Sequence, residues 1–309
     1  MNSTQSWVQD YVKYMLADDT ESGLFLKTKH FPETFYRYRK INGYTLQSLE
    51  RNELYLSPIE DLNDPFESAM SLDHNACLKV FFSSDVFATQ LKRRGGISLA
   101  KGEIQTIINS NTPYETYRLL CHKKGLEIPQ TSEQLYQRVM ARWQEIKTEG
   151  ARNVRVCCFS ETNESTTMWS HYADNHKGIC IAYNFSETDT IRPILQPILY
   201  TTEMPKITTL EDLTMLKIIM ASVHKSPEWS YEREWRITAM PTQTGTPNQI
   251  SVPTPKAIYL GDRFQNNDPD MVSKLKNILA SKSIPVYKIT RDDGNYRLLI
   301  KEFPSFYDS

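Results

Sequence analysis

The sequence has few cysteines and no motif that pairs them. It contains five in 309 residues, an odd number, and none are spaced Cys-x-x-Cys. Cys157 and Cys158 are adjacent in an apolar run, where free thiols usually act as small core residues. His171 and His176 are five residues apart, which does not place them on one helical face as metal ligands. We therefore expect a reducing cytoplasm, no disulfide framework and no metal site.

Long apolar runs and phosphate-binding loops are also missing. The first residues lack the basic start and apolar stretch of a secretory signal, and no segment is long enough to span a bilayer. Neither GxxxxGK[ST] nor a GxGxxG after a strand occurs, which disfavours P-loop and Rossmann nucleotide binding. The 36 basic and 37 acidic residues give no overall attraction for nucleic acid and leave open only a local basic groove. We expect no membrane partner.

The periodicity of apolar residues predicts an α+β fold. Short strands alternate irregularly with helices, which favours mixed or antiparallel small sheets with flanking helices over a doubly wound parallel sheet. Strands are expected at about 34–39, 54–57, 153–159, 178–185, 231–239, 256–260, 285–290 and 296–301. Helices are expected at about 5–16, 45–52 (with Leu46 and Leu49 inward), 132–148, 165–175, 210–224 and 268–281. We predict one domain, 1–309, with a polar helical insertion at 71–150.

The most informative segment is Ser230–Ile237, Ser-Tyr-Glu-Arg-Glu-Trp-Arg-Ile. As a strand it would carry Glu232, Glu234 and Arg236 on one face, because side chains alternate. Two carboxylates at this spacing repel each other, and a buried carboxylate needs a partner. The segment is either a solvated edge strand with an Arg–Glu pair or part of a functional site.

Two further clusters have both a functional and a structural interpretation. Arg37 and Arg39 would share one face of a strand, as a fork for phosphate or carboxylate or as a solvent-facing pair. Asn63, Asp64 and Glu67 belong to Asn-Asp-Pro-Phe-Glu, which commonly forms a turn or helix cap. Pro65 suits the first position of a new helix, whose first turn would hold Glu67.

A third cluster follows the strand that ends in Cys-Phe-Ser. Ser160 stands at the end of that strand, a common position for functional side chains. Trp169 and Tyr172 are three residues apart and share a helical face, which indicates a core stripe or one wall of a ligand site. His171 points away from that face, and neither His171 nor His176 has a neighbouring serine or cysteine placed to suggest a triad.

The order of these motifs closely resembles a widespread bacterial and phage domain family of unknown function. The markers are Asn-Asp-Pro-Phe-Glu, Met-Trp-x-x-Tyr-Ala and Tyr-Glu-x-Glu-x-Arg, and the matching pieces span about Phe35–Gly261 apart from the helical insertion. The family label supplies no activity.

A looser resemblance is to mono-ADP-ribosyltransferases of the arginine–serine–glutamate class. Arg37 or Arg39, Ser160 and Glu232-Arg233-Glu234 occur in the order of that class, although only the serine of Cys-Phe-Ser matches its Ser-Thr-Ser. The resemblance implies a related fold with NAD as substrate. The arginine would hold the pyrophosphate, Ser160 would order the site, and Glu234 would stabilise the oxocarbenium-like transition state.

These roles are chemically consistent. Breaking the bond to nicotinamide builds positive charge on the ribose, which a carboxylate such as Glu234 opposes, while Glu232 would act as general base. Trp169 or Tyr172 would stack on a ring of the nucleotide. The leading hypothesis is an NAD-dependent ADP-ribosyltransferase or NAD glycohydrolase, as a toxin or phage-defence effector with an unidentified protein or nucleic-acid acceptor.

Two other classes stay open. One is a Mg²⁺-dependent nuclease or hydrolase that uses Asp64, Glu67, Glu232 and Glu234. The other is a non-enzymatic ligand sensor in a defence system.

Overall fold

The computed structural model describes residues 3–67, 69–208, 214–239, 242 and 247–307. The chain divides into two compact units. Unit 1 comprises Met1–Glu67, Arg152–Thr202 and Ser222–Ser309, and unit 2 comprises Ser68–Ala151 and Glu203–Ala221. Helices and mixed sheets confirm the predicted α+β class. No helix in the described ranges has both the length and the apolar composition that crossing a bilayer requires.

Unit 1 is built on a mixed sheet that has nine strands within the described residues, larger than the small sheets expected. Its path runs β15 (Leu298–Glu302), β14 (Val286–Arg291), β13 (Ala257–Leu260), β6 (Ile179–Tyr183), β1 (Phe35–Arg39), β5 (Arg155–Ser160), β11 (Glu234–Ala239) and β7 (Leu195–Pro197), with β3 (Ser57–Pro58) paired to β5. β13 and β14 are parallel, joined through α11 (Pro269–Ser281), and the other neighbours are antiparallel. β6 is buried along its whole length, as its apolar sequence predicts.

Shorter elements complete unit 1. Two-stranded sheets pair β10 (His224–Lys225) with β8 (Leu199–Tyr200), and β12 (Gln249–Ser251) with β2 (Glu53–Tyr55). The remaining helices are α1 (Ser3–Leu16), α2 (Thr20–Lys29), α3 (Gly43–Arg51) and α9 (Thr166–Tyr172). The 3₁₀ turns are η1 (Ile59–Asp61), η2 (Arg192–Ile194), η3 (Pro227–Glu232), η4 (Phe264–Asn266) and η5 (Pro304–Tyr307).

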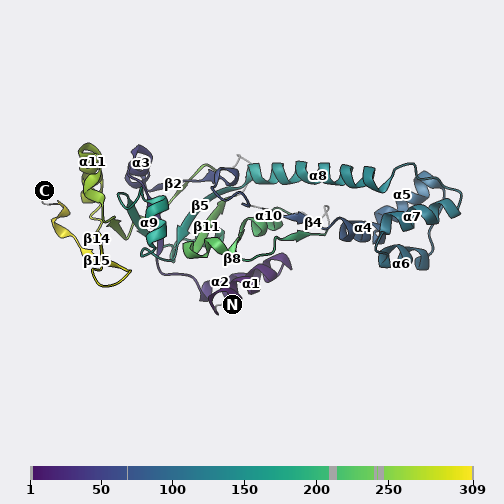
Figure 1. The fold of residues 1–309 in the computed structure, drawn as a ribbon, viewed down its shortest axis with the longest axis horizontal. Coiled ribbons are helices and arrows are strands. Elements are labelled where there is room, and N and C mark those ends of the chain that lie inside the picture. Colours follow the sequence, from purple (N-terminus) through teal and green to yellow (C-terminus); the bar gives the residue numbers. More distant parts are fainter. Residues whose placement is uncertain (1–2, 68, 209–213, 240–241, 243–246, 308–309) are drawn as a thin grey trace. The chain divides into compact units, whose positions relative to one another are not determined.

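One face of the main sheet packs against α3 and α11, which lie side by side (Figure 1). Asn42 caps α3 by accepting a hydrogen bond from the Thr45 N–H, and Leu46 and Leu49 are buried as predicted. The core on this face includes Phe35, Leu46, Leu49, Cys157, Phe159, Trp235, Ile237, Leu275 and Leu279. The odd-numbered residues of β1 and β11 therefore point to this core.

The opposite face is covered by α9. The Ser165 hydroxyl caps this helix by accepting from the Met168 N–H. Met168 and Trp169 pack with Tyr38, Cys180 and other apolar residues in a second, smaller core. The candidate polar residues of β5 and β11 lie on this side of the sheet.

Unit 2 is mainly helical. It contains α4 (His74–Ser83), α5 (Asp85–Gly95), α6 (Lys101–Asn109), α7 (Pro113–Lys123), most of α8 (Ser132–Asn153) and most of α10 (Met215–Ser222), with β4 (Ser71–Leu72) paired to β9 (Lys206–Ile207). Helices α4 to α7 gather beside the first turns of α8 (Figure 1). The predicted insertion at 71–150 falls inside this unit, but the prediction left out 203–221.

Several predicted elements need correction. The residues around Glu67 form a turn and not the first turn of a helix. Helix α2 was not predicted, and α8 extends further than 148. Residues 210–213, the start of the helix predicted at 210–224, lie outside the described residues. The strand predicted at 231–239 begins only at Glu234.

Candidate functional site

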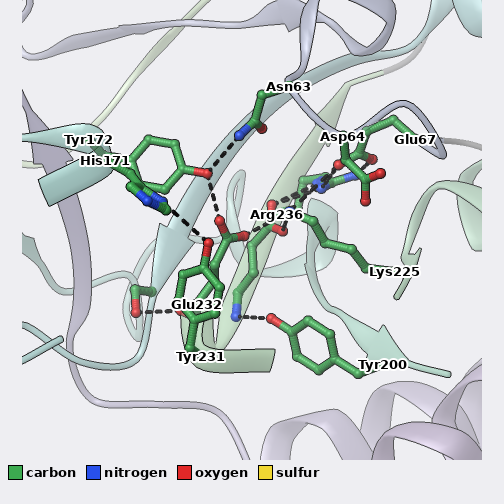
Figure 2. A network of polar contacts seen from close by, with 12 residues as sticks. Asn63, Asp64, Glu67, His171, Tyr172, Tyr200, Lys225, Tyr231, Glu232 and Arg236 are labelled. Atoms are coloured by element: carbon green, nitrogen blue, oxygen red, sulfur yellow. Dashed lines mark hydrogen bonds and ion pairs between the residues drawn. The ribbon is translucent and has the colours of Figure 1, made fainter. Parts of the chain in front are cut away.

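A buried cluster of three carboxylates and two cations lies beside β11 (Figure 2). Arg236 donates from Nη1 and Nη2 to the Glu67 oxygens at 2.8 and 3.0 Å, and from Nε and Nη2 to Glu234 Oε1 at 3.0 and 2.8 Å. Lys225 Nζ donates to Glu232 Oε2 at 2.7 Å and Glu234 Oε2 at 3.1 Å. All five side chains are at most 5% exposed. With every group ionised, the cluster carries one excess negative charge.

The two glutamates meet at Lys225 because the chain turns between them. Glu232 ends η3, Arg233 has the left-handed angles φ 46° and ψ 53°, and Glu234 starts β11. The prediction that Glu232 and Glu234 share one strand face is therefore wrong. A non-glycine residue in this conformation costs roughly 1–2 kcal/mol, and it places both carboxylates on one ammonium group.

The two glutamates differ in electrostatics. Burial alone raises the pKa of Glu234, but Arg236 and Lys225 outweigh it and lower the pKa to about 2. Burial raises the pKa of Glu232, and the nearby Glu234 charge adds to that effect, while Lys225 opposes it. Glu234 is thus held as an ion by two cations, whereas Glu232 holds a proton more easily than an ordinary glutamate. Glu232 is the better acid–base group.

Glu232 also accepts a hydrogen bond from a tyrosine hydroxyl, whose pKa is raised by burial and by Glu232 itself. The Tyr172 hydroxyl donates to Glu232 Oε1 at 2.6 Å and accepts from Asn63 Nδ2 at 3.1 Å. Ser160 Oγ, fully buried, donates to the backbone carbonyl of Glu232 at 2.6 Å and so fixes its position. Asn63, Ser160 and Tyr172 were all predicted as site residues, and all three contact Glu232 or the tyrosine bound to it.

A cavity of about 170 Å³ adjoins the cluster. Its lining includes the predicted residues Arg37, Arg39, Asn63, Glu67, Ser160, Tyr172, Glu232, Glu234 and Arg236. Apolar cavities of roughly 150 Å³ hold one benzene ring, so this space fits a single ring or sugar.

The arginines reach the cavity from the other face of the sheet. Tyr36 pairs with Ser160, and Ser160 pairs with Glu234, so these three side chains share a face that excludes Arg37 and Arg39. The cavity is lined by both sets beside the single position at which β1 and β5 pair, Tyr36 with Ser160. The structure therefore brings the arginines and the glutamates to one cavity but not to one face.

Arg37 and Arg39 lack carboxylate partners. Within the described residues, neither has a carboxylate oxygen within 4.0 Å or a side-chain hydrogen bond, although the Arg37 guanidinium lies 6.0 Å from the centre of the Phe159 ring. Both are partly buried. Burial, and then the Arg37 charge, lower the pKa of Arg39 to about 10. Two adjacent half-buried cations without a counter-charge favour the binding of an anion.

Three predicted residues do not line the cavity. Trp169 was expected to stack on a ligand, but it is fully buried, donates from Nε1 to the Asn163 carbonyl at 2.8 Å and packs against Tyr38. His171 is exposed, 3.4 Å from the Tyr231 hydroxyl. Asp64 accepts from the Phe66 N–H at 2.9 Å, the turn role that its sequence also allowed.

Sequence reasoning missed Lys225 and Tyr200. Lys225 lies on β10 directly opposite Tyr200 on β8, and the Tyr200 hydroxyl accepts from the Glu234 N–H at 2.8 Å. Their sequence neighbours carry no motif. The only sequence feature that could have indicated Lys225 is an apolar stretch that ends in this lysine, seven residues before Glu232, and it is a weak signal.

The carboxylates have cations as partners. In the described part of the chain, no three His, Cys, Asp or Glu side chains are grouped as metal ligands. Glu67 and Glu234 are both bound by Arg236 instead, so a protein cation already occupies the carboxylates that a Mg²⁺ enzyme would need.

Comparison with known proteins gives a family without an assigned activity. Residues 168–237, from α9 to β11, match a family model described as a protein of unknown function (DUF2971). The match covers Tyr172, Lys225, Glu232, Glu234 and Arg236. Searches of the curated proteins and of the solved structures gave no match.

Proposed function

We propose that the protein binds a nucleotide in this cavity and cleaves its N-glycosidic bond, with NAD as the first candidate substrate. It would act as an NAD glycohydrolase or mono-ADP-ribosyltransferase, in the cytoplasm, as a toxin or phage-defence effector. The observation that supports this most is that one cavity is lined by an acid–base candidate, Glu232, oriented by Tyr172, and by two arginines without carboxylate partners. A nucleotide has a glycosidic bond on which Glu232 can act and phosphates that the two arginines can bind.

Glu232 would do the chemistry in this proposal. Loss of nicotinamide leaves positive charge on the ribose, and the cluster beside the cavity carries an excess negative charge that opposes it. The Glu232 carboxylate, whose pKa is raised by burial, would then take a proton from the attacking water or acceptor hydroxyl. Tyr172 orients Glu232 through the 2.6 Å hydrogen bond.

Glu234 takes a different role from the one the sequence suggested. Arg236 binds its Oε1 and Lys225 its Oε2, and these two cations lower its pKa, so this carboxylate stays ionised and holds both cations in place. The cavity has room for one ring, so the nicotinamide or its ribose would occupy it. Arg37 and Arg39, which line the same cavity, would bind the phosphates.

The test is nicotinamide release from NAD by the full-length chain, measured by chromatography. Glu232→Gln should lower the rate by roughly 10²–10⁴-fold, the usual contribution of an acid–base group. The matched control is Glu228→Gln, an exposed residue of the same η3 turn, which should keep the rate. Arg39→Gln should raise KM for NAD more than it lowers kcat.

Other outcomes would point elsewhere. No release together with Mg²⁺-dependent cleavage of RNA or DNA would indicate the nuclease class. Saturable NAD binding without turnover would indicate a sensor. Equal rates in Glu232→Gln and Glu228→Gln would refute the proposed role of Glu232.

A further inference from the structure

Unit 2 contains a second cavity, larger than the first and unrelated in chemistry. It measures about 490 Å³, within the range of roughly 300–1,000 Å³ typical of small-molecule sites. Its walls come from α4, α5, α7, α8 and the segment between α7 and α8, and they include the aromatic residues Phe81, Phe82, Phe87, Tyr114 and Tyr117. The rings of Phe81, Phe82, Phe87 and Tyr117 form one connected network. Its shortest distance, 4.9 Å, joins the ring centres of Phe82 and Phe87.

The walls also carry polar groups without partners. His74 lines the cavity, and its Nε2 atom is buried without a hydrogen bond. Arg138, on α8, lines the cavity as well, and within the described residues no carboxylate lies within ion-pair distance of it. A buried ring nitrogen without a partner is costly, so a ligand group that hydrogen-bonds to it would gain affinity.

We propose that this cavity binds a small amphipathic acid, with an aromatic or branched apolar body and one anionic group. The aromatic walls remove the body from water, which is the main source of affinity in such sites. Arg138 supplies the charge that selects an anion, and His74 Nε2 offers a hydrogen bond to it. The site is independent of the nucleotide cavity, so either proposal can fail without the other.

The experiment uses the full-length chain and 8-anilinonaphthalene-1-sulfonate, whose fluorescence rises in apolar sites. Binding should be saturable at one site. Two ligands of one shape, 1-naphthoate and 1-naphthamide, then compete with the dye. Naphthoate should displace it at a concentration roughly 3–10-fold lower, since it alone can pair with Arg138.

Two variant pairs locate the site. Arg138→Gln should remove the preference for naphthoate, whereas Arg142→Gln, one turn along α8 and paired with Glu145, should keep it. Val139→Phe should fill part of the cavity and weaken dye binding, while Val86→Phe, exposed on α5 and outside the cavity, should not. Circular dichroism checks that each variant folds.

Two results would overturn the proposal. One is dye binding that does not saturate. The other is equal behaviour of Arg138→Gln and Arg142→Gln, which decides the case even if Val139→Phe does not fold, because Arg138 is exposed at the rim.

Discussion

Replacing Glu234 by glutamine should destabilise unit 1 strongly. The folded-state pKa of about 2 against the ordinary 4.5 means that folding favours the ionised form. At about 1.4 kcal/mol per pKa unit, this difference corresponds to roughly 3 kcal/mol of stability at pH 7. Glutamine keeps the shape but leaves Arg236 and Lys225 short of one negative charge. For a unit of roughly 200 residues the melting temperature should fall by roughly 6–12 °C.

Replacing Glu232 by glutamine should, in contrast, leave the stability of unit 1 unchanged and remove the activity. Its folded-state pKa is raised, so the charge contributes no stability at pH 7, and its loss should leave the melting temperature unchanged or slightly higher. Lys225 still pairs with Glu234 at 3.1 Å. Under the proposed function, nicotinamide release should nevertheless be lost.

The assay is thermal unfolding of both variants by circular dichroism at pH 7, alongside the NAD assay. The expected pattern is a destabilised Glu234→Gln and an inactive, stable Glu232→Gln. The assignment of a structural role to Glu234 and an acid–base role to Glu232 is refuted by either of two results. One is a melting temperature of Glu234→Gln within about 2 °C of the parent protein, and the other is a Glu232→Gln variant that is destabilised as strongly as is expected for Glu234→Gln.

Three more predictions follow from the same geometry. The stability that Glu234 contributes is complete above pH about 4.5 and is lost as the pH falls through about 2, so acid titration should destabilise the parent protein more than Glu234→Gln over this range. Gly178→Ala should destabilise by at least roughly 1–3 kcal/mol in urea unfolding, because its Cβ would lie 2.3 Å from the Arg39 carbonyl; Gly43→Ala, with open space around it, is the control. Arg233→Gly should leave the melting temperature equal or higher, since glycine relieves the left-handed conformation and the exposed Glu161 pair at 3.6 Å contributes little; a clear loss of stability would contradict this.

Local pattern was enough to place most strands of the main sheet and the helices that flank it. The apolar run of β6, the capped helix α3 with Leu46 and Leu49, and α11 after Asp268-Pro269 are set by signals within a few residues. The same patterns missed the turn at Arg233, because nothing in Glu-Arg-Glu distinguishes an alternating strand from a strand preceded by a left-handed residue.

The sequence by itself named about half of the cavity lining, including Arg37, Arg39, Ser160, Tyr172, Glu232 and Glu234. Only the tertiary structure decided their roles. Lys225, from another strand, and Arg236 together hold Glu234 as an ion, while Glu67, from a distant segment, is the second carboxylate bound by Arg236. Glu232, whose pKa is raised, is left as the acid–base group. The pairing of β1 with β5 at a single position decided that the arginines line the cavity from the opposite face. Charge and burial at a residue depend on these neighbours, and no local stretch of sequence contains them.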